Sequence, residues 1–152
     1  MKDWQEAPVF GERSESVCYT LRPGAYVLLG DDLGQLALVR TPQGVFLPGG
    51  GIEADETPEQ AATRETLEEC GLVVRVGSWA AWAVQFCYSE SENTHFEKRC
   101  TFVDAVVEGV APSKTEADHE LLWVAPDAAS ELITHESQRW AIEVWRNRMT
   151  GR

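Results

Sequence analysis

The sequence predicts an α/β fold in a single domain, and three observations lead to this prediction. The chain has 152 residues, 43% of them hydrophobic, which is enough for one compact core. Short segments rich in β-branched and aromatic residues are separated by turn residues, as in β-strands, and three other segments carry helix signals. Because no repeat, low-complexity tract or linker interrupts the sequence, we expect residues 1–152 to form one domain.

The first part of the chain is predicted to be mainly β-structure. Residues 1–16 are polar and have no clear period, so we expect a loosely held N-terminal arm or an edge segment there. Three strands follow, and the last two should form a hairpin; the strands are residues 17–22, 24–30 and 35–40. A brief apolar piece at 45–47 runs into a loop at 48–51, where three adjacent glycines allow positive φ and the close approach of another group.

The second part of the chain is predicted to contain more strands and two helices. The strands are residues 72–76, 79–88, 99–110 and 120–124, with a polar hairpin loop at 89–98. A brief helix is expected at 126–133, since its first residue is a proline. The last helix is expected at about 136–149, where apolar residues recur at helical spacing.

The strongest helix signal lies between Thr57 and Gly71. A threonine hydroxyl, a proline at the first helical position and a glutamine three residues after the cap form a typical helix start. The glycine supplies the matching stop. On one side of this helix, small and mostly apolar residues should pack on a sheet, namely Ala62, Thr66 and Cys70 with Leu67 beside them.

Three glutamates share the other face of the same helix. Glu65, Glu68 and Glu69 lie at i, i+3 and i+4, a spacing at which like charges destabilise an isolated helix. A solvated acidic face is the ordinary explanation for such a cluster. A hard divalent cation such as Mg²⁺ would also compensate for it, because this ion prefers oxygen ligands. For the three glutamates alone, the solvated face is the preferred interpretation.

The longer pattern favours the metal. Gly50, five residues, Glu56, seven residues and then the run from Arg64 to Leu72 resemble the Nudix box, G-x5-E-x7-R-E-U-x-E-E-x-G-U, in which U is aliphatic. Every glycine, glutamate and arginine of the box is in register. The one departure is Thr66 at the first U, and we expect its hydroxyl to bond a backbone carbonyl one turn earlier.

The resemblance implies a fold, an activity and a set of residue roles. The fold would be the Nudix α/β/α sandwich with a mixed sheet, and the activity would be Mg²⁺-dependent hydrolysis of a pyrophosphate bond in a nucleoside diphosphate derivative, with Mn²⁺ as a substitute ion. Arg64 would orient the glutamates and Glu56 would support them from the loop. Carried over from the family, the metal ligands are Gly49 through its carbonyl, Glu65, Glu68 and Glu69, and Glu68 or Glu69 would accept a proton from water.

Residues outside the box are candidates for further roles. Some relatives use an acid from a later loop, for which Glu116 is preferred over Glu120 by its resemblance to a late ligand in MutT-like proteins. Arg40, at the end of a strand expected to point toward the glycine loop, could contact a phosphate, although a surface role is the commoner one for arginine. Tyr88 lies where a tyrosine accompanies the family's diadenosine polyphosphate hydrolases, so dinucleoside polyphosphates are one suggested substrate class.

Composition limits the partners that we expect. The formal net charge is −12, which repels duplex nucleic acid and anionic membranes but leaves small nucleotides open when a cation is bound. No apolar run or leader-like N-terminus stands out, so a soluble, cytoplasmic protein is expected. The four cysteines form no pair of metal-binding spacing and should be buried thiols. The resemblance also allows a homodimer, and the alternative function is a catalytically silent Nudix-fold module that binds nucleotide or protein.

Overall fold

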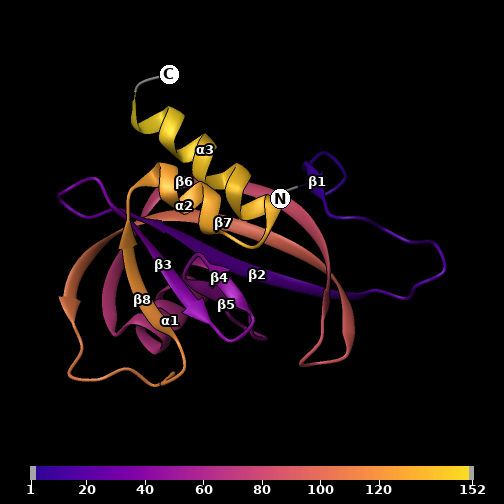
Figure 1. Ribbon diagram of the computed structural model, residues 1–152, viewed down its shortest axis with the longest axis horizontal. Helices are drawn as coiled ribbons and strands as arrows, with labels where there is room; N and C mark the ends of the chain where they lie inside the picture. Colours follow the sequence, from indigo (N-terminus) through magenta and orange to yellow (C-terminus); the bar gives the residue numbers. More distant parts are fainter. Residues whose placement is uncertain (1–2, 151–152) are drawn as a thin grey trace.

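The computed structural model describes residues 3–150 and has an α/β/α architecture (Figure 1). The strands are β1 (Val9–Phe10), β2 (Thr20–Leu29), β3 (Leu36–Thr41), β4 (Gly44–Phe46), β5 (Gly49–Gly51), β6 (Leu72–Ser89), β7 (Thr94–Val110) and β8 (Glu120–Val124). The helices are α1 (Pro58–Cys70), α2 (Pro126–Leu132) and α3 (Glu136–Met149). All three predicted helices are therefore confirmed to within about one residue.

The strands form a five-stranded sheet and a three-stranded sheet. The order in the larger sheet is β1-β6-β7-β2-β5, in which β6 and β7 are antiparallel but β2 runs parallel to β7. The smaller sheet has the order β4-β3-β8 and is antiparallel throughout. The predicted mixed β-structure is confirmed, because one sheet combines parallel and antiparallel pairs.

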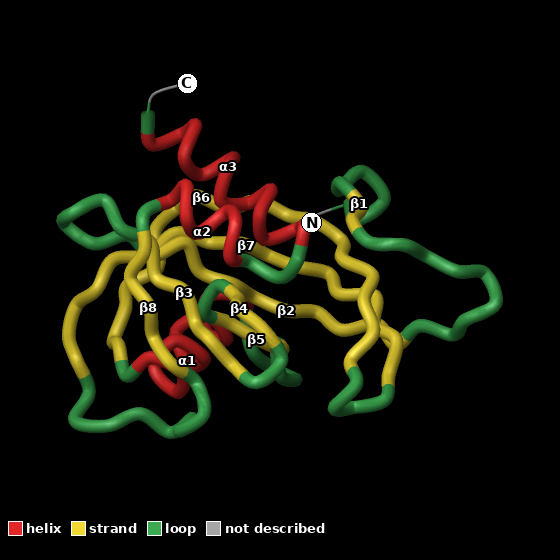
Figure 2. Tube along the Cα trace, in the orientation of Figure 1, coloured by secondary structure: helices red, strands yellow, loops and turns green. Residues whose placement is uncertain are grey.

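Helices cover both faces of the β-structure (Figure 2). Alternate residues of β2 point to opposite faces, so Leu28 packs in one hydrophobic cluster and Val27 in another. The first cluster includes Ile142 of α3, and the second includes Ala62 of α1. All these side chains are fully buried. The two clusters fix α1 on one face and α3 on the other.

Several predicted strand boundaries were wrong. Residues 17–22 and 24–30 are not two strands, since β2 runs without a break through Pro23 and Gly24. The predicted hairpin between 24–30 and 35–40 is reduced to a single antiparallel bridge from Gly30 to Leu36, after which the two strands enter different sheets. The predicted glycine loop is a short strand, β5, that pairs with β2. Pairing with a neighbouring strand overrides the turn propensity of glycine and proline at these positions.

The β6–β7 hairpin is longer than predicted. Residues 72–76 and 79–88 belong to one strand with an irregularity between Val76 and Ala80, and residues 94–98 belong to β7 rather than to the loop. Part of the N-terminal arm lies at the sheet edge, because Val9 and Phe10 pair in parallel with β6. No helix within residues 3–150 is long and apolar enough to cross a membrane.

The cysteines depart in part from the prediction of buried thiols. All four are free, and Cys70 and Cys100 are buried as expected. Cys18 is exposed and Cys87 is only partly buried.

Candidate active site

Helix α1 begins and ends where its capping residues predict. Thr57 accepts a hydrogen bond from the backbone N–H of Gln60, whose side chain accepts one from the backbone of Thr57. The helix ends at Gly71, which has φ of 68°. Leu67 was expected to pack on the sheet, but this residue is 40% exposed, whereas Ala61 is buried. The packed face of the helix is therefore rotated away from Leu67.

Thr66, the residue that departs from the Nudix box, is fully buried. Its hydroxyl donates to the carbonyl of Ala62 at 2.7 Å, which is the predicted bond to the preceding turn. The departure therefore leaves no unpaired polar group in this part of the core.

The glycines of β5 bring the backbone close to the acidic side of α1. Gly49 has φ of 147°, and a Cβ atom there would lie 2.2 Å from the carbonyl oxygen of Ala25. A Cβ atom on Gly50 would lie 2.8 Å from the carboxylate carbon of Glu65. Gly49 needs glycine for its backbone conformation, and a side chain at Gly50 would displace the carboxylate of Glu65. The predicted close approach of another group is confirmed.

Arg64 connects the loop before α1 to the glutamates on it. Its guanidinium donates two hydrogen bonds to Glu56, at 2.6 and 2.9 Å, in the bidentate geometry that suits a carboxylate. Its Nη1 donates to Glu65 at 3.0 Å and to Glu68 at 3.4 Å, and the Nη2 that bonds Glu56 also donates to the carbonyl of Gly51 at 3.1 Å. The charged hydrogen bond lowers the pKa of Glu56 to about 2. Arg64 thus holds the carboxylates of two helix residues in place.

Glu69 differs from the other two helix glutamates because it is buried. Only 7% of the residue is exposed, whereas the expectation placed it on an open acidic face. Its Oε1 accepts the backbone N–H of Gly49 at 2.8 Å. Burial raises the pKa of Glu69 to about 8 against the opposite effect of this hydrogen bond, and the charges of Glu65, Glu116 and Glu68 raise it further. Burial also raises the pKa of Glu65 against the hydrogen bond and charge of Arg64, with smaller increases from the charges of Glu68 and Glu116.

A later loop closes over the C-terminal end of α1. The carbonyl of Glu68 accepts the backbone N–H groups of Thr115 and Glu116, at 3.1 and 2.9 Å. These donors satisfy a carbonyl that a helix end leaves free. Lys114 donates to the backbone carbonyls of Glu116 and His119 from inside the loop. The loop thereby holds Glu116 near the helix glutamates.

His119 joins this loop to the acidic cluster. Its Nε2 lies 3.4 Å from Oε2 of Glu69, and its Nδ1 lies 2.8 Å from Asp118. The ligand atoms of Glu116, Asp118 and His119 lie within 4.8 Å of one another, close enough to hold a metal ion. His119 was not singled out in the sequence, because a lone histidine has no distinctive spacing there. The signal that could have identified it is the group of acids around this histidine, immediately before strand β8.

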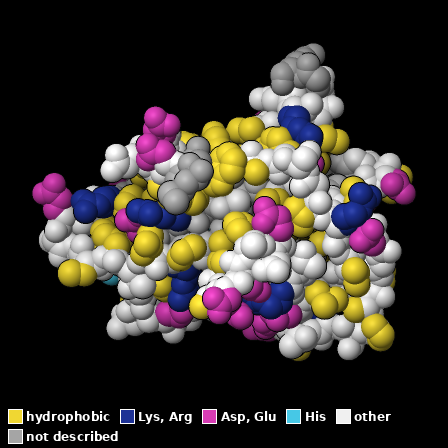
Figure 3. Space-filling view, turned by 180° about the vertical axis from the view of Figure 1, so that it is seen from behind, with side chains coloured by type: hydrophobic (Ala, Val, Ile, Leu, Met, Phe, Trp, Pro, Cys, Tyr) yellow, Lys and Arg dark blue, Asp and Glu magenta, His cyan; other side chains and the backbone are white. Residues whose placement is uncertain are grey.

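Figure 3 shows the surface from behind, with acidic side chains gathered beside basic ones on its lower part. The charges of this strongly acidic protein are therefore partly neutralised by neighbouring cations, as those of the helix glutamates are by Arg64.

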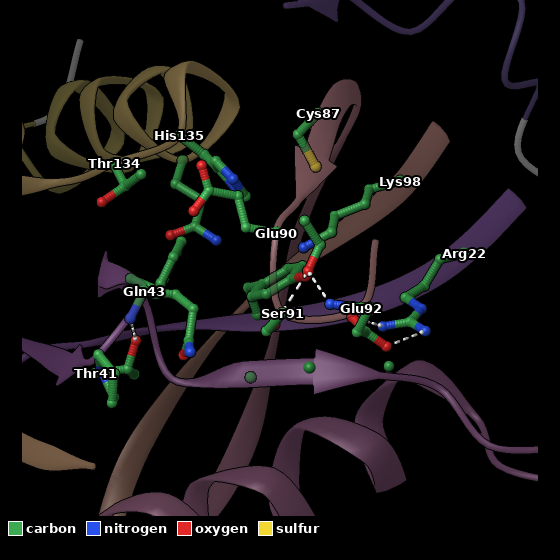
Figure 4. Close-up of a pocket in the computed structure, with 18 of the residues that line it drawn as sticks. Arg22, Thr41, Gln43, Cys87, Glu90, Ser91, Glu92, Lys98, Thr134 and His135 are labelled. Atoms are coloured by element: carbon green, nitrogen blue, oxygen red, sulfur yellow. Dashed lines mark hydrogen bonds and ion pairs between the residues drawn. The ribbon is translucent and has the colours of Figure 1, made fainter. Parts of the chain in front are cut away.

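A cavity of about 900 Å³ opens beside the acidic cluster (Figure 4). Gly49, Gly50, Gly51, Glu69 and His119 form one part of its lining. Other parts come from the β6–β7 hairpin and from the segment before α3. Its volume is in the range of small-molecule sites, so it could hold a nucleotide with one end at Glu69.

Two cations of the larger sheet lie in this cavity. Arg22 and Lys98 are partners on the parallel strands β2 and β7, and both line the cavity. Arg22 forms two hydrogen bonds with Glu92, at 3.1 and 3.2 Å, and Figure 4 shows this pair at the cavity wall. Lys98 has no ion pair with any residue in the described part of the chain. It was not singled out in the sequence, because a lysine in a strand carries no distinctive pattern.

The predicted substrate-binding residues differ in position. Tyr88 lines the cavity and donates a hydrogen bond to Asn93 at 2.6 Å. Arg40 is not part of the lining; its guanidinium lies 3.4 Å from Glu120, and both side chains are more than half exposed. The placement therefore keeps Tyr88 as a candidate and gives no support for Arg40. It also favours Glu116 over Glu120 as the later acid, since Glu120 pairs with Arg40.

The residues around Glu69 fit a hard divalent cation. Carboxylate oxygens and the backbone carbonyls of β5 are the donor types that Mg²⁺ prefers. A cation would also relieve the repulsion that raises the pKa of the buried Glu69. Glu65, Glu69 and the carbonyl of Gly49 would hold it, with Glu68 and Glu116 at its edge.

Comparisons with known proteins agree with this geometry. The family profile described as NUDIX domain matches residues 20–145. The chain is 34% identical over 90 residues to a protein of Mycobacterium tuberculosis named "Putative 8-oxo-dGTP diphosphatase 3", covering 59% of this chain and 41% of the relative. It is 30% identical over 110 residues to "Nudix hydrolase 21, chloroplastic" of Arabidopsis thaliana, covering 70% of this chain and 52% of the relative.

The fold has solved counterparts. The structure titled "NUDIX hydrolase from Nitrosomonas europaea" superposes with a TM-score of 0.66 at 20% identity, covering 84% of this chain and 89% of that one. At this level of identity the likeness concerns the fold. The chain spans about half or less of the length of the two curated relatives that it matches.

Proposed function

The chain belongs to the NUDIX domain family, and from this premise we propose that it is a hydrolase that cleaves a pyrophosphate bond in a nucleoside diphosphate derivative with the help of Mg²⁺. We further propose that residues 1–152 act as a single catalytic domain. The observation that carries the proposal is the position of Glu69, which is buried on α1 against β5 and lines the cavity. A buried carboxylate with a raised pKa, among other carboxylates at a cavity, is typical of a functional site.

Names of relatives support the substrate class. One relative is named an 8-oxo-dGTP diphosphatase, and another, from a Marinomonas species, is named an RNA pyrophosphohydrolase. The first name concerns a diphosphate of a nucleotide and the second a pyrophosphate of RNA. We propose the same bond type here, with the nucleotide in the cavity and its diphosphate at Glu69.

Bound Mg²⁺ would neutralise charge on the diphosphate and make a water molecule more acidic. The residues of the chain would supply alignment and proton transfer. Arg64 would keep Glu65 and Glu68 in place, and the N–H of Gly49 would fix the orientation of Glu69. Lys98 would attract the substrate phosphates, since it is the cation in this cavity that Glu92 does not neutralise.

We assign the role of proton acceptor to Glu68. Its side chain is 33% exposed, and the single bond from Arg64 at 3.4 Å leaves one carboxylate oxygen free. Glu116 is the alternative acceptor, because it approaches the same cluster from the later loop. Replacing each by glutamine would distinguish them, since the true acceptor should lower kcat much more than the other.

The experiment is a substrate screen with Mg²⁺ in ¹⁸O-labelled water, using nucleoside triphosphates, nucleoside diphosphate sugars, dinucleoside polyphosphates and oxidised nucleotides. We expect cleavage of at least one class, with the label on one phosphorus atom, and a loss of orders of magnitude in kcat for Glu69→Gln. If no substrate is cleaved under any condition, the chain is a silent binding module. If Glu69→Gln retains full turnover, the site is wrongly assigned.

A further inference from the structure

Gln138 is a buried polar residue in the cavity wall whose amide is only half used. It is 1% exposed, and its Oε1 accepts the backbone N–H of Leu47 at 2.8 Å. A backbone N–H can only donate, so the amide oxygen must face Leu47 and the NH₂ group must face away from it. Among residues 3–150, no acceptor bonds this NH₂ group.

The NH₂ group of Gln138 opens into the cavity. Gln138 is part of the cavity lining. Among the described residues, the hydroxyl of Ser137 is the side-chain polar atom that is fully enclosed and has no hydrogen-bond partner. The amide nitrogen of Gln138 also has no partner but is not fully enclosed, so it is open to the cavity that the residue lines. A buried side chain with a free donor facing a cavity is suited to an acceptor on a ligand.

This donor lies close to the acidic cluster. Leu47 and Gly49 donate their N–H groups to Gln138 and Glu69, while the carbonyl of Pro48 accepts from Val27 on the other side. In an extended segment, backbone groups of successive residues point to opposite sides, so the N–H groups of Leu47 and Gly49 point the same way and lie about 7 Å apart. The amide of Gln138 and the carboxylate of Glu69 therefore lie on one side of the segment at a separation that one nucleotide can bridge.

Flat rings lie beside the donor. Phe46 and His135 both line the cavity, and their ring centroids are 5.1 Å apart in an edge-to-face arrangement. Burial lowers the pKa of His135 to about 4, with a smaller effect from Lys98, so this ring is uncharged at neutral pH. Figure 4 shows His135 at the helical side of the cavity. Apolar ring surface next to a single donor is suited to a nucleobase with a carbonyl edge.

We propose that this part of the cavity reads the base, with the NH₂ group of Gln138 donating to O6 of guanine or O4 of uracil, the position at which adenine and cytosine carry an amino group. The inference rests on the proposed nucleotide substrate and specifies its base. A glutamine whose amide oxygen and nitrogen are both free can bind adenine, because the oxygen accepts from the adenine amino group while the nitrogen donates to a ring nitrogen. The oxygen of Gln138 is held by Leu47, so the amino groups of adenine and cytosine would meet a donor. Guanine and uracil nucleotides are therefore favoured.

The test is equilibrium binding of non-hydrolysable analogues of GDP, UDP, ADP and CDP in the presence of Mg²⁺, measured by calorimetry, so that the cation is bound and no cleavage occurs. We expect GDP or UDP to bind about tenfold more tightly than ADP and CDP. The GDP and UDP arms separate a purine from a pyrimidine subsite. Gln138→Glu keeps an oxygen for Leu47 and replaces the donor by an acceptor, so the preference should reverse towards ADP or CDP. The added charge weakens all four ligands alike, so the ratio is the quantity to compare.

Equal binding of all four nucleotides to the wild-type protein would overturn the inference, and so would a variant that binds more weakly with an unchanged ratio. The wild-type ratio decides the matter even if the variant fails to fold. A keto preference in a protein that cleaves no nucleotide would support the base subsite and refute the hydrolase. Cleavage without base preference would refute the subsite and leave the hydrolase intact.

Discussion

Replacing Glu69 by glutamine should stabilise the metal-free protein while removing its function. The amide keeps an oxygen for the N–H of Gly49 but cannot ionise. Folding raises the pKa of Glu69 from 4.5 to about 8, chiefly by burial, so the folded state holds a proton that the unfolded state has lost. Ionisation of this acid therefore lowers the free energy of unfolding as the pH rises from 4.5 towards 8, and the effect is absent below 4.5.

The size of this effect follows from the pKa shift. At pH 7 the group contributes a destabilisation of about 3 kcal/mol relative to a side chain that does not ionise. Urea unfolding in EDTA at several pH values should show Glu69→Gln to be more stable than wild type by up to that amount at pH 7, with the difference vanishing near pH 4.5. Glu59→Gln, at an exposed acid in the first turn of α1, is the control and should show no such trend. Parallel pH curves for wild type and Glu69→Gln would refute the reasoning.

Three further predictions concern other parts of the site. Gly50→Ala should reduce Mg²⁺ affinity, measured by calorimetry, and kcat by about tenfold or more, because the new Cβ would displace the carboxylate of Glu65. The control is Gly51→Ala, whose Cβ would meet open space, and it should behave as wild type in both measurements. Lys98→Met should raise KM with little change in kcat. The control is Arg75→Met, which makes the same charge change at a surface ion pair outside the cavity and should leave KM unaltered. Equal effects of the two substitutions on KM would mean that only the net charge matters. Thr66→Val should cost about 1 kcal/mol in urea unfolding and leave metal affinity unchanged, so a loss of metal binding would contradict its purely structural role.

The sequence was most informative where a short pattern has a local physical cause. Thr57 and Gly71 delimit α1 correctly, since helix caps depend on neighbouring residues only. The three glycines at 49–51 likewise predicted the close approach of another group, which is the carboxylate of Glu65, although they were expected to form a loop and not a strand. These features involve contacts within about 25 residues of chain.

The errors occurred where distant segments decide the local structure. Gly24 reads as a turn, yet it lies inside β2 because Gly51 and Cys100 pair with it from either side. The same limit applies to Glu69, whose helix position predicts exposure but whose burial depends on β5 and on the loop that carries His119. Such contacts between elements have no counterpart in the periodicity of a single segment.

The functional residues outside the box were hardest to find. Gln138 and Lys98 come from different elements, and no spacing relates them to the glutamates. Arg40 was chosen because its strand was expected to point at the glycine loop, but its pairing with Glu120 turns it to the surface. Cavity lining is a property of the assembled sheets, so these positions required the structure.

Anomalous diffraction from a crystal soaked in Mn²⁺ with a non-hydrolysable nucleotide analogue would show whether the acidic side of α1 binds a divalent cation. We expect an anomalous peak between Glu69, Glu65 and the backbone of β5, next to the diphosphate. A peak confined to Glu116, Asp118 and His119, or no peak at all, would contradict this expectation.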